Sequence, residues 1–534
     1  MGFWGANGHD GVWHLTLINS LSHGSFQMPV FAGKTLQNYH IGFDLILAGI
    51  HKITNIPAHI LYFQIIPPLI ALAIGVLVYK FIYLWRRSST QAFWATFFVY
   101  FGGGFGWMIA FFRDGGFGGE SVFWSQQSIS TLVNPPFALS LVFLVGALIL
   151  LLKLQKQFTT WRFVFCVLLF SVLIQIKAYA AVLALGGLLV ASVWQVWKER
   201  KIINLGVFIS SLFISVILFF PFNKTASSLI VFQPFWFLET MMLYTDRLGW
   251  TKYFEAMTTY RMGGVWVKAV AAYVLAFAIF WVGNMGTRLF KGFLIVKWFR
   301  EHKKVSFVEI FISFVIVAGA ILPLFFLQKG TPWNTIQFFY YTLFFAGILA
   351  GMSLGEWLEK EGMKLKKIAV ATIIVILTIP TTVGTLLIVY LPMRPPAALS
   401  NQEREALEFL KQQESGIVLT YPFDKHAAKV AEANPPRPLY LYESTAYVSA
   451  FSGKPVYLED EVNLEITGYE WRARRDKTEG FFGNLGSQQA QSFLIDSKTR
   501  YIYLVGEQKD RLEDRGLKLV KIFNNNAVDI YRVY

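Results

Sequence analysis

Acidic and histidine side chains cluster near the start of the chain, and their chemical types suit proton transfer or metal binding. GHDGVWH at 8–14 brings His9, Asp10 and His14 together, just before a stretch with an amphipathic helical pattern. A carboxylate at a boundary between water and lipid can take a proton from a hydroxyl group, or it can help to hold a metal ion. The alternative role of Asp10 is structural, as the N-cap of a helix that starts near residue 12.

A second group of the same kind follows in NYHIGFD at 38–44. His40 and Asp44 are four residues apart, so they share one face if this stretch is helical. His9, His14 and His40 are metal-ligand types, but nothing fixes their spacing as a metal motif requires. The metal, if there is one, stays unassigned, and a solvated or hydrogen-bonded role is the alternative for each histidine.

Four cationic side chains are candidates for binding a phosphate group. Lys177 lies in QIKAYA between two apolar stretches, Arg247 and Arg261 lie in the aromatic-rich segment 223–263, and Lys329 lies in QKGTPWNT. Ammonium and guanidinium groups form charge-assisted hydrogen bonds with phosphate oxygens. The alternatives are snorkelling from a helix end for Lys177 and solvated faces for the other cations.

Two further acidic groups carry less weight. Asp114 and Glu120 belong to the glycine-rich segment RDGGFGGES, and we keep them as supporting candidates. Near the end of the chain, YLEDEVNLEITGYEWRARRDK at 457–477 contains an acidic turn and a basic turn, which we interpret as solvated faces. Facing a membrane, its arginines could instead meet anionic headgroups or substrate phosphates.

The elements that must position these side chains are membrane-spanning helices. Hydrophobic residues make up 55% of the chain and charged residues only 15%, against about 25% in ordinary soluble proteins. The recurring apolar runs are long enough to cross a hydrocarbon core of about 30 Å, where the backbone must be helical or form a closed barrel. They do not alternate as barrel strands do, so we predict about ten spans. The spans are predicted near 59–85, 92–112, 135–153, 161–176, 177–197, 202–222, 264–284, 305–327, 336–355 and 366–391.

The distribution of lysine and arginine predicts the orientation of these spans. One set of short loops is rich in both residues, and such loops stay in the cytoplasm. The net charge of +15 is therefore explained by topology, and we predict no nucleic-acid partner. Residues 1–58 and everything after 391 then lie outside the cytoplasm. We expect a first span to be missing ahead of residue 1, and an N-out start is the alternative.

The composition divides the chain into four parts. Residues 1–58 form a first outer loop with interfacial helices at 12–23 and 37–53, and 59–391 form an all-α polytopic membrane domain. A proline-rich linker at 392–398 leads to a soluble, extracytoplasmic α/β domain at 399–534. Its strand candidates are GIVLTYP, KPVYL, RYIYLVG and NNNAVDIYRVY.

Several motif classes are absent from the sequence. It contains no P-loop, dinucleotide fingerprint, cysteine–histidine zinc pattern or nucleophile elbow. Few charges fall in the middle of a predicted span, whereas ion-coupled transporters need ionisable groups or broken helices there. The polar groups gather instead at the outer boundary, which favours interfacial chemistry over transport.

This layout resembles the GT-C membrane glycosyltransferases, the group that includes protein O-mannosyltransferases, aminoarabinose transferases and oligosaccharyltransferases. Their long first outer loop carries an acidic residue near its start and interfacial helices, and many end in an outer soluble domain. GHDGVWHLTLINSL at 8–21 is similar to the acidic start of that loop, and LQNYHIGFDLILAGI at 36–50 to its second helix. Many relatives have two adjacent acidic residues, whereas His9 and Gly11 flank Asp10 here.

The resemblance implies a sugar transfer from a polyprenyl-phosphate or polyprenyl-diphosphate donor to an unidentified acceptor at the outer membrane face, with inversion. Asp10 would be the catalytic base or a metal-binding acid. The donor phosphate would be bound by Lys177, Arg261, Lys329 or Arg247. Members of the group differ in metal dependence, so a divalent metal cofactor stays open.

Two other classes of function compete with this interpretation. A transporter or flippase of lipid-linked saccharides predicts a polar path through the bundle and a pseudo-symmetric repeat, and neither is visible in the sequence. A scaffold protein that presents the C-terminal domain predicts that the boundary charges form no common pocket.

Overall fold

The computed structural model divides into two compact units, each built from segments that are distant in sequence. It describes residues 1–124, 127–223, 230–292, 294, 305–483, 485–512 and 516–534. Unit 1 comprises Met1–Ile66, Phe222–Leu229 and Leu391–Tyr534, and unit 2 comprises Pro67–Pro221 and Ile230–Tyr390. The first and last segments of the chain therefore share one unit, while the four-part division at 58, 392 and 399 stays a prediction.

Unit 2 is a bundle of long apolar helices. Eight helices in the described part of the chain are long and apolar enough to cross a membrane, and two shorter apolar helices accompany them. Together they coincide with the ten predicted stretches, while the number of spans and their orientation stay predictions. The long helices are Ala58–Arg86 (containing α4, Ile66–Arg86), Ser89–Asp114 (α5, Ser89–Phe101, and α6, Gly106–Asp114), Pro135–Lys156 (α9), Ala178–Glu199 (α11), Trp266–Phe290 (containing α15, Trp266–Met285), Phe307–Phe325 (α17), Pro332–Glu359 (containing α18, Gln337–Glu359) and Lys364–Tyr390 (containing α19, Lys364–Thr385), and the shorter ones are Thr160–Ile176 (α10) and Ile203–Phe219 (α12).

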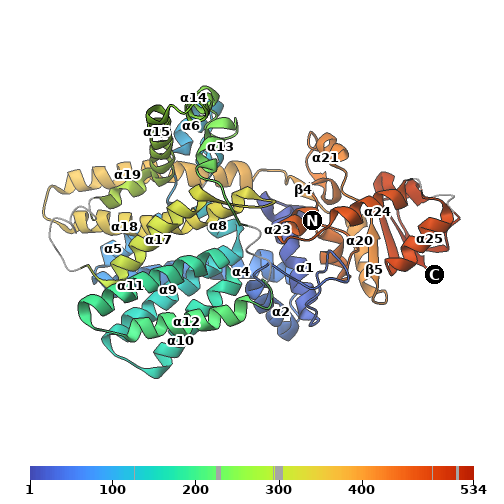
Figure 1. Ribbon diagram of the computed structural model, residues 1–534, viewed down its shortest axis with the longest axis horizontal. Helices are drawn as coiled ribbons and strands as arrows, with labels where there is room; N and C mark the ends of the chain where they lie inside the picture. Colours follow the sequence, from blue (N-terminus) through green and yellow to red (C-terminus); the bar gives the residue numbers. More distant parts are fainter. Residues whose placement is uncertain (125–126, 224–229, 293, 295–304, 484, 513–515) are drawn as a thin grey trace. The chain divides into compact units, whose positions relative to one another are not determined.

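Helix α18 is the centre of unit 2. Its apolar window is 89% buried, the highest share of any candidate span, and Phe339, Phe344 and Phe345 are fully enclosed. Helices α5 and α17 pack against it, while α9, α10, α11 and α12 lie side by side (Figure 1). Shorter elements cover the connections: α7 (Glu120–Phe123), α8 (Gln127–Val133), α13 (Trp236–Leu243), α14 (Thr251–Met262), and the antiparallel strands β2 (Ile230–Phe232) and β3 (Phe326–Gln328).

One span is interrupted, which the sequence reasoning did not foresee. Three glycines at 102–104 separate α5 from α6, and a Cβ on Gly103 would lie 2.8 Å from the carbonyl oxygen of Thr378. The freed backbone is bonded inside the protein, since Thr381 Oγ1 donates to the Gly104 carbonyl at 2.7 Å. Such breaks are tolerated in membranes only where protein satisfies the backbone.

Arg288 lies next to this break and is only 1% exposed. Its guanidinium donates to the carbonyl oxygens of Gly102 and Asn284. The charge is therefore solvated by backbone carbonyls of the break and of α15, an arrangement that the sequence does not reveal.

Unit 1 contains a mixed four-stranded sheet in the order β5-β7-β9-β8. Strands β5 (Ile417–Thr420) and β7 (Thr499–Val505) are parallel, and β9 (Val528–Val533) is antiparallel to both β7 and β8 (Leu519–Asn524). KPVYL, predicted as a strand, forms a single bridge between Val418 and Val456. The predicted strands in GIVLTYP, RYIYLVG and NNNAVDIYRVY are present as β5, β7 and β9.

Helices and a small second sheet complete unit 1. The strands β1 (Gly2–Phe3), β4 (Ala397–Ala398) and β6 (Arg437–Pro438) pair in the order β1-β4-β6, which fastens the start of the chain to the segment after the bundle. The helices of this unit are α1 (Asp10–Ser22), α2 (Gly42–Thr54), α3 (Ala58–Ile60), α20 (Asn401–Gln412), α21 (Lys425–Ala431), α22 (Tyr447–Ser452), α23 (Glu461–Ile466), α24 (Arg472–Phe482) and α25 (Ser487–Asp496).

Helix α1 is a core element of unit 1. It was expected to lie in the membrane interface, yet residues on all its faces are buried, because α2 and α22 pack against it. Thr16 Oγ1 bonds Ser449 Oγ at 2.5 Å, so even its polar positions are covered. Helix α2 does keep an exposed apolar face, on which Leu45 is 47% and Ile53 is 84% exposed.

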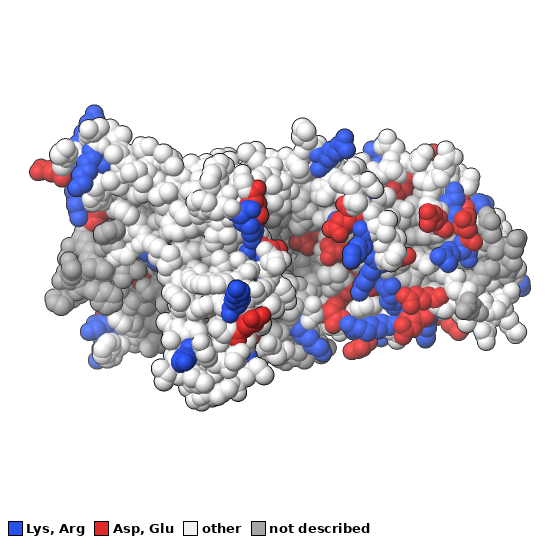
Figure 2. Space-filling view, turned by 90° about the horizontal axis from the view of Figure 1, so that it is seen from above, with Lys and Arg blue, Asp and Glu red and all other residues white. Residues whose placement is uncertain are grey.

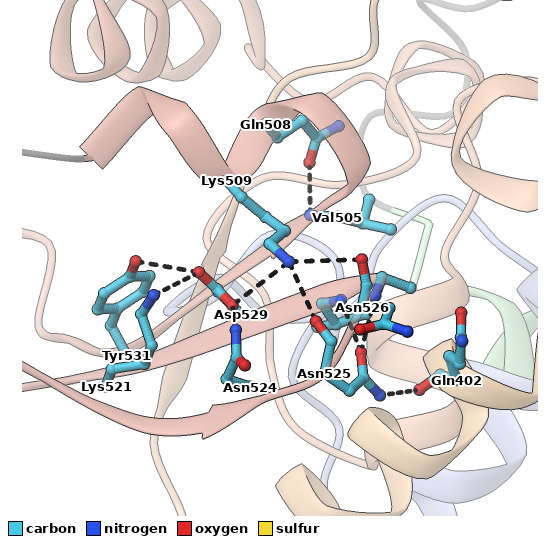
Figure 3. A network of polar contacts seen from close by, with 12 residues as sticks. Gln402, Val505, Gln508, Lys509, Lys521, Asn524, Asn525, Asn526, Asp529 and Tyr531 are labelled. Carbon is cyan, nitrogen blue, oxygen red and sulfur yellow. Dashed lines mark hydrogen bonds and ion pairs between the residues drawn. The ribbon is translucent and has the colours of Figure 1, made fainter.

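The β8–β9 hairpin is held by a polar network around Asp529 (Figure 3). Asp529 is 2% exposed. Its carboxylate lies 2.8 Å from Lys521 Nζ and accepts a hydrogen bond from Tyr531 at 3.2 Å. Burial acts against the charged form, but the bonds from Lys521 and Asn524 outweigh it and lower the pKa of Asp529. The carboxylate is therefore fully paired within the hairpin.

Candidate functional site

Asp10 opens helix α1 with its carboxylate accessible to solvent. The N-cap residue of α1 is His9, whose side chain makes no capping bond, and Asp10 is the first helical residue. The N-cap role considered for Asp10 is therefore wrong. Its side chain is 55% exposed, and the helix dipole favours a negative charge in the first turn. A solvent-accessible carboxylate therefore lies at the end of α1 where the helix dipole is positive.

His9 lies between two carboxylates. Its Nδ1 is 3.0 Å from Asp10 Oδ1 and its Nε2 is 3.2 Å from Asp460 Oδ1. Asn463 donates to Asp460 from its backbone amide at 3.1 Å and from its side chain at 2.9 Å. The ring of His9 thus connects an exposed carboxylate at the start of α1 to a buried one at the start of α23.

The two carboxylates change the protonation of His9. Burial of the ring opposes the charged form, but the charge of Asp460 and the hydrogen bonds to Asp10 and Asp460 outweigh it, and the pKa of His9 is raised well above its usual value. A doubly protonated ring donates to both carboxylates at once. His9 therefore fixes the position of the Asp10 carboxylate and balances part of its charge.

Asp460 is the residue that sequence reasoning missed. It belongs to the acidic turn that was interpreted as a solvated face, yet Asp460 is 0%, Glu459 8% and Glu461 6% exposed, so that interpretation is wrong. Asp460 adopts a left-handed conformation with φ 52°, which aspartate tolerates better than most residues. Neither its burial, its contact with His9 nor its left-handed conformation can be read from sequence.

His14 and Asp44 form a second pair, inside unit 1. His14 Nδ1 is 2.7 Å from Asp44 Oδ1, and Asp44 is fully buried. The His14 ring stacks on Tyr62 at 5.4 Å. Burial raises the pKa of Tyr39 well above its usual value, and the charges of Asp44 and Asp10 raise it further. Both carboxylates therefore act on the same side chain, which places the two acidic groups in one region.

His40 does not share a helix face with Asp44. Helix α2 begins at Gly42, so His40 precedes it. The ring of His40 stacks on Tyr39 with 4.6 Å between centroids. The expected shared face is absent because the helix starts at Gly42, five residues later than the predicted start at residue 37.

The candidate cations all belong to unit 2, and two of them are buried. Lys177 is 6% exposed, and its Nζ lies 5.7 Å from the centre of the Tyr179 ring. Arg247 is 2% exposed. Its guanidinium carbon lies 4.1 Å from the Trp333 ring and 4.6 Å from the Trp124 ring. Burial lowers the pKa of Arg247 to about 10, despite the nearby charge of Asp246, so it stays cationic near neutral pH.

The other two cations are more accessible. The side chain of Arg261 is 41% exposed and forms an ion pair with Glu239, which also accepts a hydrogen bond from Tyr273. Lys329 is exposed in the loop after β3. An incoming phosphate would have to displace Glu239 from Arg261 but could reach Lys329 directly.

The two supporting acidic candidates of unit 2 differ in environment. Asp114 is exposed and pairs with Arg113 at 3.0 Å. Arg113 also donates to the backbone oxygen of Arg247 at 2.7 Å. Burial raises the pKa of Glu120 to about 7, although a hydrogen bond from Tyr390 opposes the shift. Glu120 is therefore a mixture of charged and neutral forms near neutral pH.

The residues around Asp10 offer no complete set of metal ligands. In the described part of the chain, no group of three or more His, Cys, Asp or Glu side chains has a metal-binding arrangement. Both nitrogens of His9 face carboxylates, which suits a protonated ring and not a ligand. We therefore derive no step through a metal ion.

Comparisons with known proteins find similarity in the fold. No protein-family model matches the sequence, and no curated protein matches it. Among solved structures, the oligosaccharyltransferase of Archaeoglobus fulgidus with Zn and sulfate superposes with a TM-score of 0.54 at 11% identity, covering 94% of this chain and 64% of that one. The same archaeal enzyme, AglB, with an inhibitory peptide and a dolichol-phosphate gives 0.51 at 11% identity, covering 94% and 66%.

These matches show that the chain has a fold similar to that of an archaeal oligosaccharyltransferase, one of the enzyme types that the sequence was predicted to resemble. The chain spans a little less than two thirds of the length of these oligosaccharyltransferases. At this identity the likeness concerns the arrangement of helices and the mixed α/β region, and it does not identify functional residues.

Proposed function

We propose that the protein is a membrane glycosyltransferase that moves a sugar from a polyprenyl-phosphate donor to an acceptor. The observation that carries the proposal is a fold similar to oligosaccharyltransferases over 94% of the chain, combined with an exposed carboxylate at the start of the first long helix. One of the similar structures holds a dolichol-phosphate, which supports a lipid-linked donor.

Asp10 acts as the base in this proposal. Its carboxylate takes the proton from an acceptor hydroxyl while the oxygen attacks the anomeric carbon of the sugar, and the bond from that carbon to the phosphate oxygen breaks. A single displacement inverts the anomeric configuration. His9 is a positioning residue, because it holds the Asp10 carboxylate through Nδ1 and is itself held by Asp460.

The departing phosphate gains negative charge, which a cation bound to it would stabilise. Lys329 is the most accessible candidate and Arg261 the next. Arg247 and Lys177 are buried against aromatic rings. They would reach the phosphate only if the donor displaces those contacts, so we rank them lower.

The test is transfer of a radiolabelled sugar from polyprenyl-phosphate donors by the full chain in proteoliposomes. Lipid and peptide acceptors are offered in parallel, and loss of label from the donor is measured. Asp10→Asn keeps the size of the side chain but cannot accept the proton, so the rate should fall by about 100- to 10,000-fold. Asp476→Asn is the matched control, since Asp476 is an exposed carboxylate on α24 and should have no effect.

The possible outcomes test the enzymatic activity and the role of Asp10 separately. Equal transfer rates in Asp10→Asn and Asp476→Asn would support a glycosyltransferase in which Asp10 is not the base. Asp44 and Asp114 would then be tested. No transfer from any donor would overturn the proposal, and a lipid-scrambling assay would then test the flippase. The interrupted helix at 102–104 is the feature of the bundle that agrees with that alternative.

A further inference from the structure

A cavity lies at the carboxyl ends of the parallel strands of unit 1. Strand β5 ends at Thr420 and β7 at Val505, and the segments that follow both strands line a hollow of about 50 Å³. Gln508 closes one side, with its Oε1 accepting a hydrogen bond from the Val505 amide (Figure 3). In sheets with parallel strands, ligands bind outside this edge.

A residue of the cavity wall carries a buried hydroxyl without a partner. Thr445 lines the cavity and is 4% exposed. Its Oγ1 is enclosed and has no hydrogen-bond partner among the described residues. Leaving such a group unsatisfied costs about 1–3 kcal/mol, and native proteins rarely do so without a ligand or an ordered water. A ligand toward which the Thr445 side chain rotates would satisfy this hydroxyl.

Aromatic rings supply the rest of the wall. Tyr421, Tyr440, Tyr447 and Tyr503 all line the cavity. The rings of Tyr447 and Tyr503 meet edge to face at 6.2 Å. Phenol rings offer an apolar face and a hydroxyl edge together, which matches a sugar ring with its C–H faces and peripheral hydroxyls.

The charge of the cavity selects against anions. Asp424, Glu443, Glu459, Asp460 and Glu461 line it, while no lysine or arginine does among the described lining residues. Burial raises the pKa of Glu459 to about 8, although two backbone amides donate to it, so it is a neutral hydrogen-bonding group at neutral pH. Glu461 is paired with Arg475 and Asp460 with His9, so Asp424 and Glu443 are the lining carboxylates that would repel a phosphate.

The cavity is connected to Asp10 through His9. Asp460 forms part of the cavity wall and also bonds His9 Nε2. Burial raises the pKa of Glu443, another wall residue, with His9 lowering it and Asp10 raising it. The cavity and the Asp10 carboxylate therefore belong to one electrostatic neighbourhood within unit 1.

We propose that this cavity binds a neutral, hydroxyl-bearing ring, namely a sugar residue of the acceptor, and excludes the phosphate-bearing donor. The identification of the ring with the acceptor rests on the proposed function, whereas the binding of a neutral sugar does not. Because the cavity is small, it takes one edge of the ring, and Thr445 contributes a hydrogen bond to a ring hydroxyl.

The experiment measures binding of methyl glycosides of glucose, galactose, mannose and N-acetylglucosamine to the full chain in nanodiscs by saturation-transfer NMR. At least one should bind, and the corresponding sugar 1-phosphate should bind at least about tenfold more weakly. Thr445→Val should weaken binding about five- to tenfold, the effect of one hydrogen bond. Thr478→Val is the matched control, because Thr478 is a buried threonine bonded to the Arg474 carbonyl and does not line the cavity.

Folding is checked by hydrogen exchange of the full chain, and Thr445→Val should leave protection equal or higher, since no internal bond is lost and an unsatisfied hydroxyl is removed. Failure of all four glycosides to bind, equal binding of the sugar 1-phosphate, or an equal effect of both threonine variants would overturn the inference. Sugar transfer that depends on Asp10 without glycoside binding would leave the proposed function standing and remove this site. Glycoside binding without any sugar transfer would support a sugar-binding site and contradict the proposed glycosyltransferase activity.

Discussion

Several buried charges of the two units are stabilised in different ways. In unit 1, ionisable side chains face each other: His9 lies between Asp10 and Asp460, and His14 bonds Asp44. In unit 2, the buried Arg247 lies against four aromatic rings. Lys177 and Lys291 likewise lie against rings, with Lys291 Nζ 4.7 Å from the Trp281 ring centre.

The difference follows from the surroundings of each unit. On the face seen in Figure 2, acidic and basic residues gather over unit 1, while the surface of unit 2 is largely uncharged. Carboxylates are scarce in a bundle of apolar helices, so these cations are stabilised by ring quadrupoles and backbone carbonyls. Arg86 is an exception in unit 2, because it pairs with Glu309 at 3.0 Å.

The largest effect should come from breaking the charge pair of unit 1. Asp460→Ala removes the buried carboxylate that faces His9 and leaves a protonated ring without its main counter-charge. Breaking a buried pair in this way costs about 3–5 kcal/mol. Hydrogen exchange of the full chain should show α1 and α23 opening much more readily. Asp460→Asn keeps the shape and a hydrogen bond, so it should cost less, and equal losses in both variants would show that charge does not matter here.

The protonation of His9 should make the stability of unit 1 depend on pH. The folded-state pKa of His9 is raised above its unfolded value, so its stabilising contribution is complete below about pH 6.5 and is lost as pH rises through the folded pKa, by up to about 1.4 kcal/mol per pH unit. Asp460, Asp10 and Glu443 are the charged groups around the ring. Protection of α1 in the wild type should fall over this range, and His9→Gln should flatten the dependence.

Glu459 provides an independent check in the same unit. Its pKa of about 8 exceeds the value near 4.3 of an unfolded glutamate. The folded state therefore holds the proton more tightly, and its stability declines as pH rises between these two values. Glu459→Gln should remove that slope and leave the slope of His9 above pH 6.5. A wild-type profile that stays flat over both ranges would contradict the account of unit 1.

A smaller effect is expected in unit 2. Arg247→Met removes a cation from its aromatic cage but retains an apolar chain of similar length. The loss comprises the cation–π contacts, about 1–2 kcal/mol, and the hydrogen bond to Thr240, about 1 kcal/mol. Hydrogen exchange of α13 and α14 is the measurement. Arg247→Lys keeps the charge and serves as the comparison. A loss as large as that of Asp460→Ala would mean that the two units do not differ as described.

The sequence predicted what depends on local composition. The ten apolar stretches were found because hydropathy over about 20 residues is a local property, and three of the four proposed strands are present. Helix α1 was predicted as a helix, but its burial was not predicted. That burial depends on α22, which carries Ser449, the bonding partner of Thr16, 433 positions along the chain.

The candidate site was predicted only in part, because its contacts join residues that are distant in sequence. Asp10 stood out by its position in a short motif, whereas Asp460 becomes special through contact with His9 across 451 positions. The burial of Arg247 depends on Trp124 and Trp333, which are distant in sequence. Such pairings are properties of the tertiary structure, and one sequence without its fold does not contain a local signal for them.

The smallest loss of stability is expected for a solvent-exposed ion pair of unit 1, because exposure reduces the stabilisation that such a pair provides. The Lys521 side chain is 41% exposed and lies 2.8 Å from Asp529. Lys521→Met removes this partner, but solvent screens the pair, and Asn524, Tyr531 and Lys509 still contact the carboxylate (Figure 3). The loss should be no more than about 1 kcal/mol, measured by exchange of the β8 and β9 amides. Asp529→Asn, by contrast, leaves two lysines without a counter-charge and should cost more. If Lys521→Met destabilised the hairpin as strongly as Asp460→Ala destabilises α23, burial would not be what makes the His9 pair strong, and the contrast between the units would lose its physical basis.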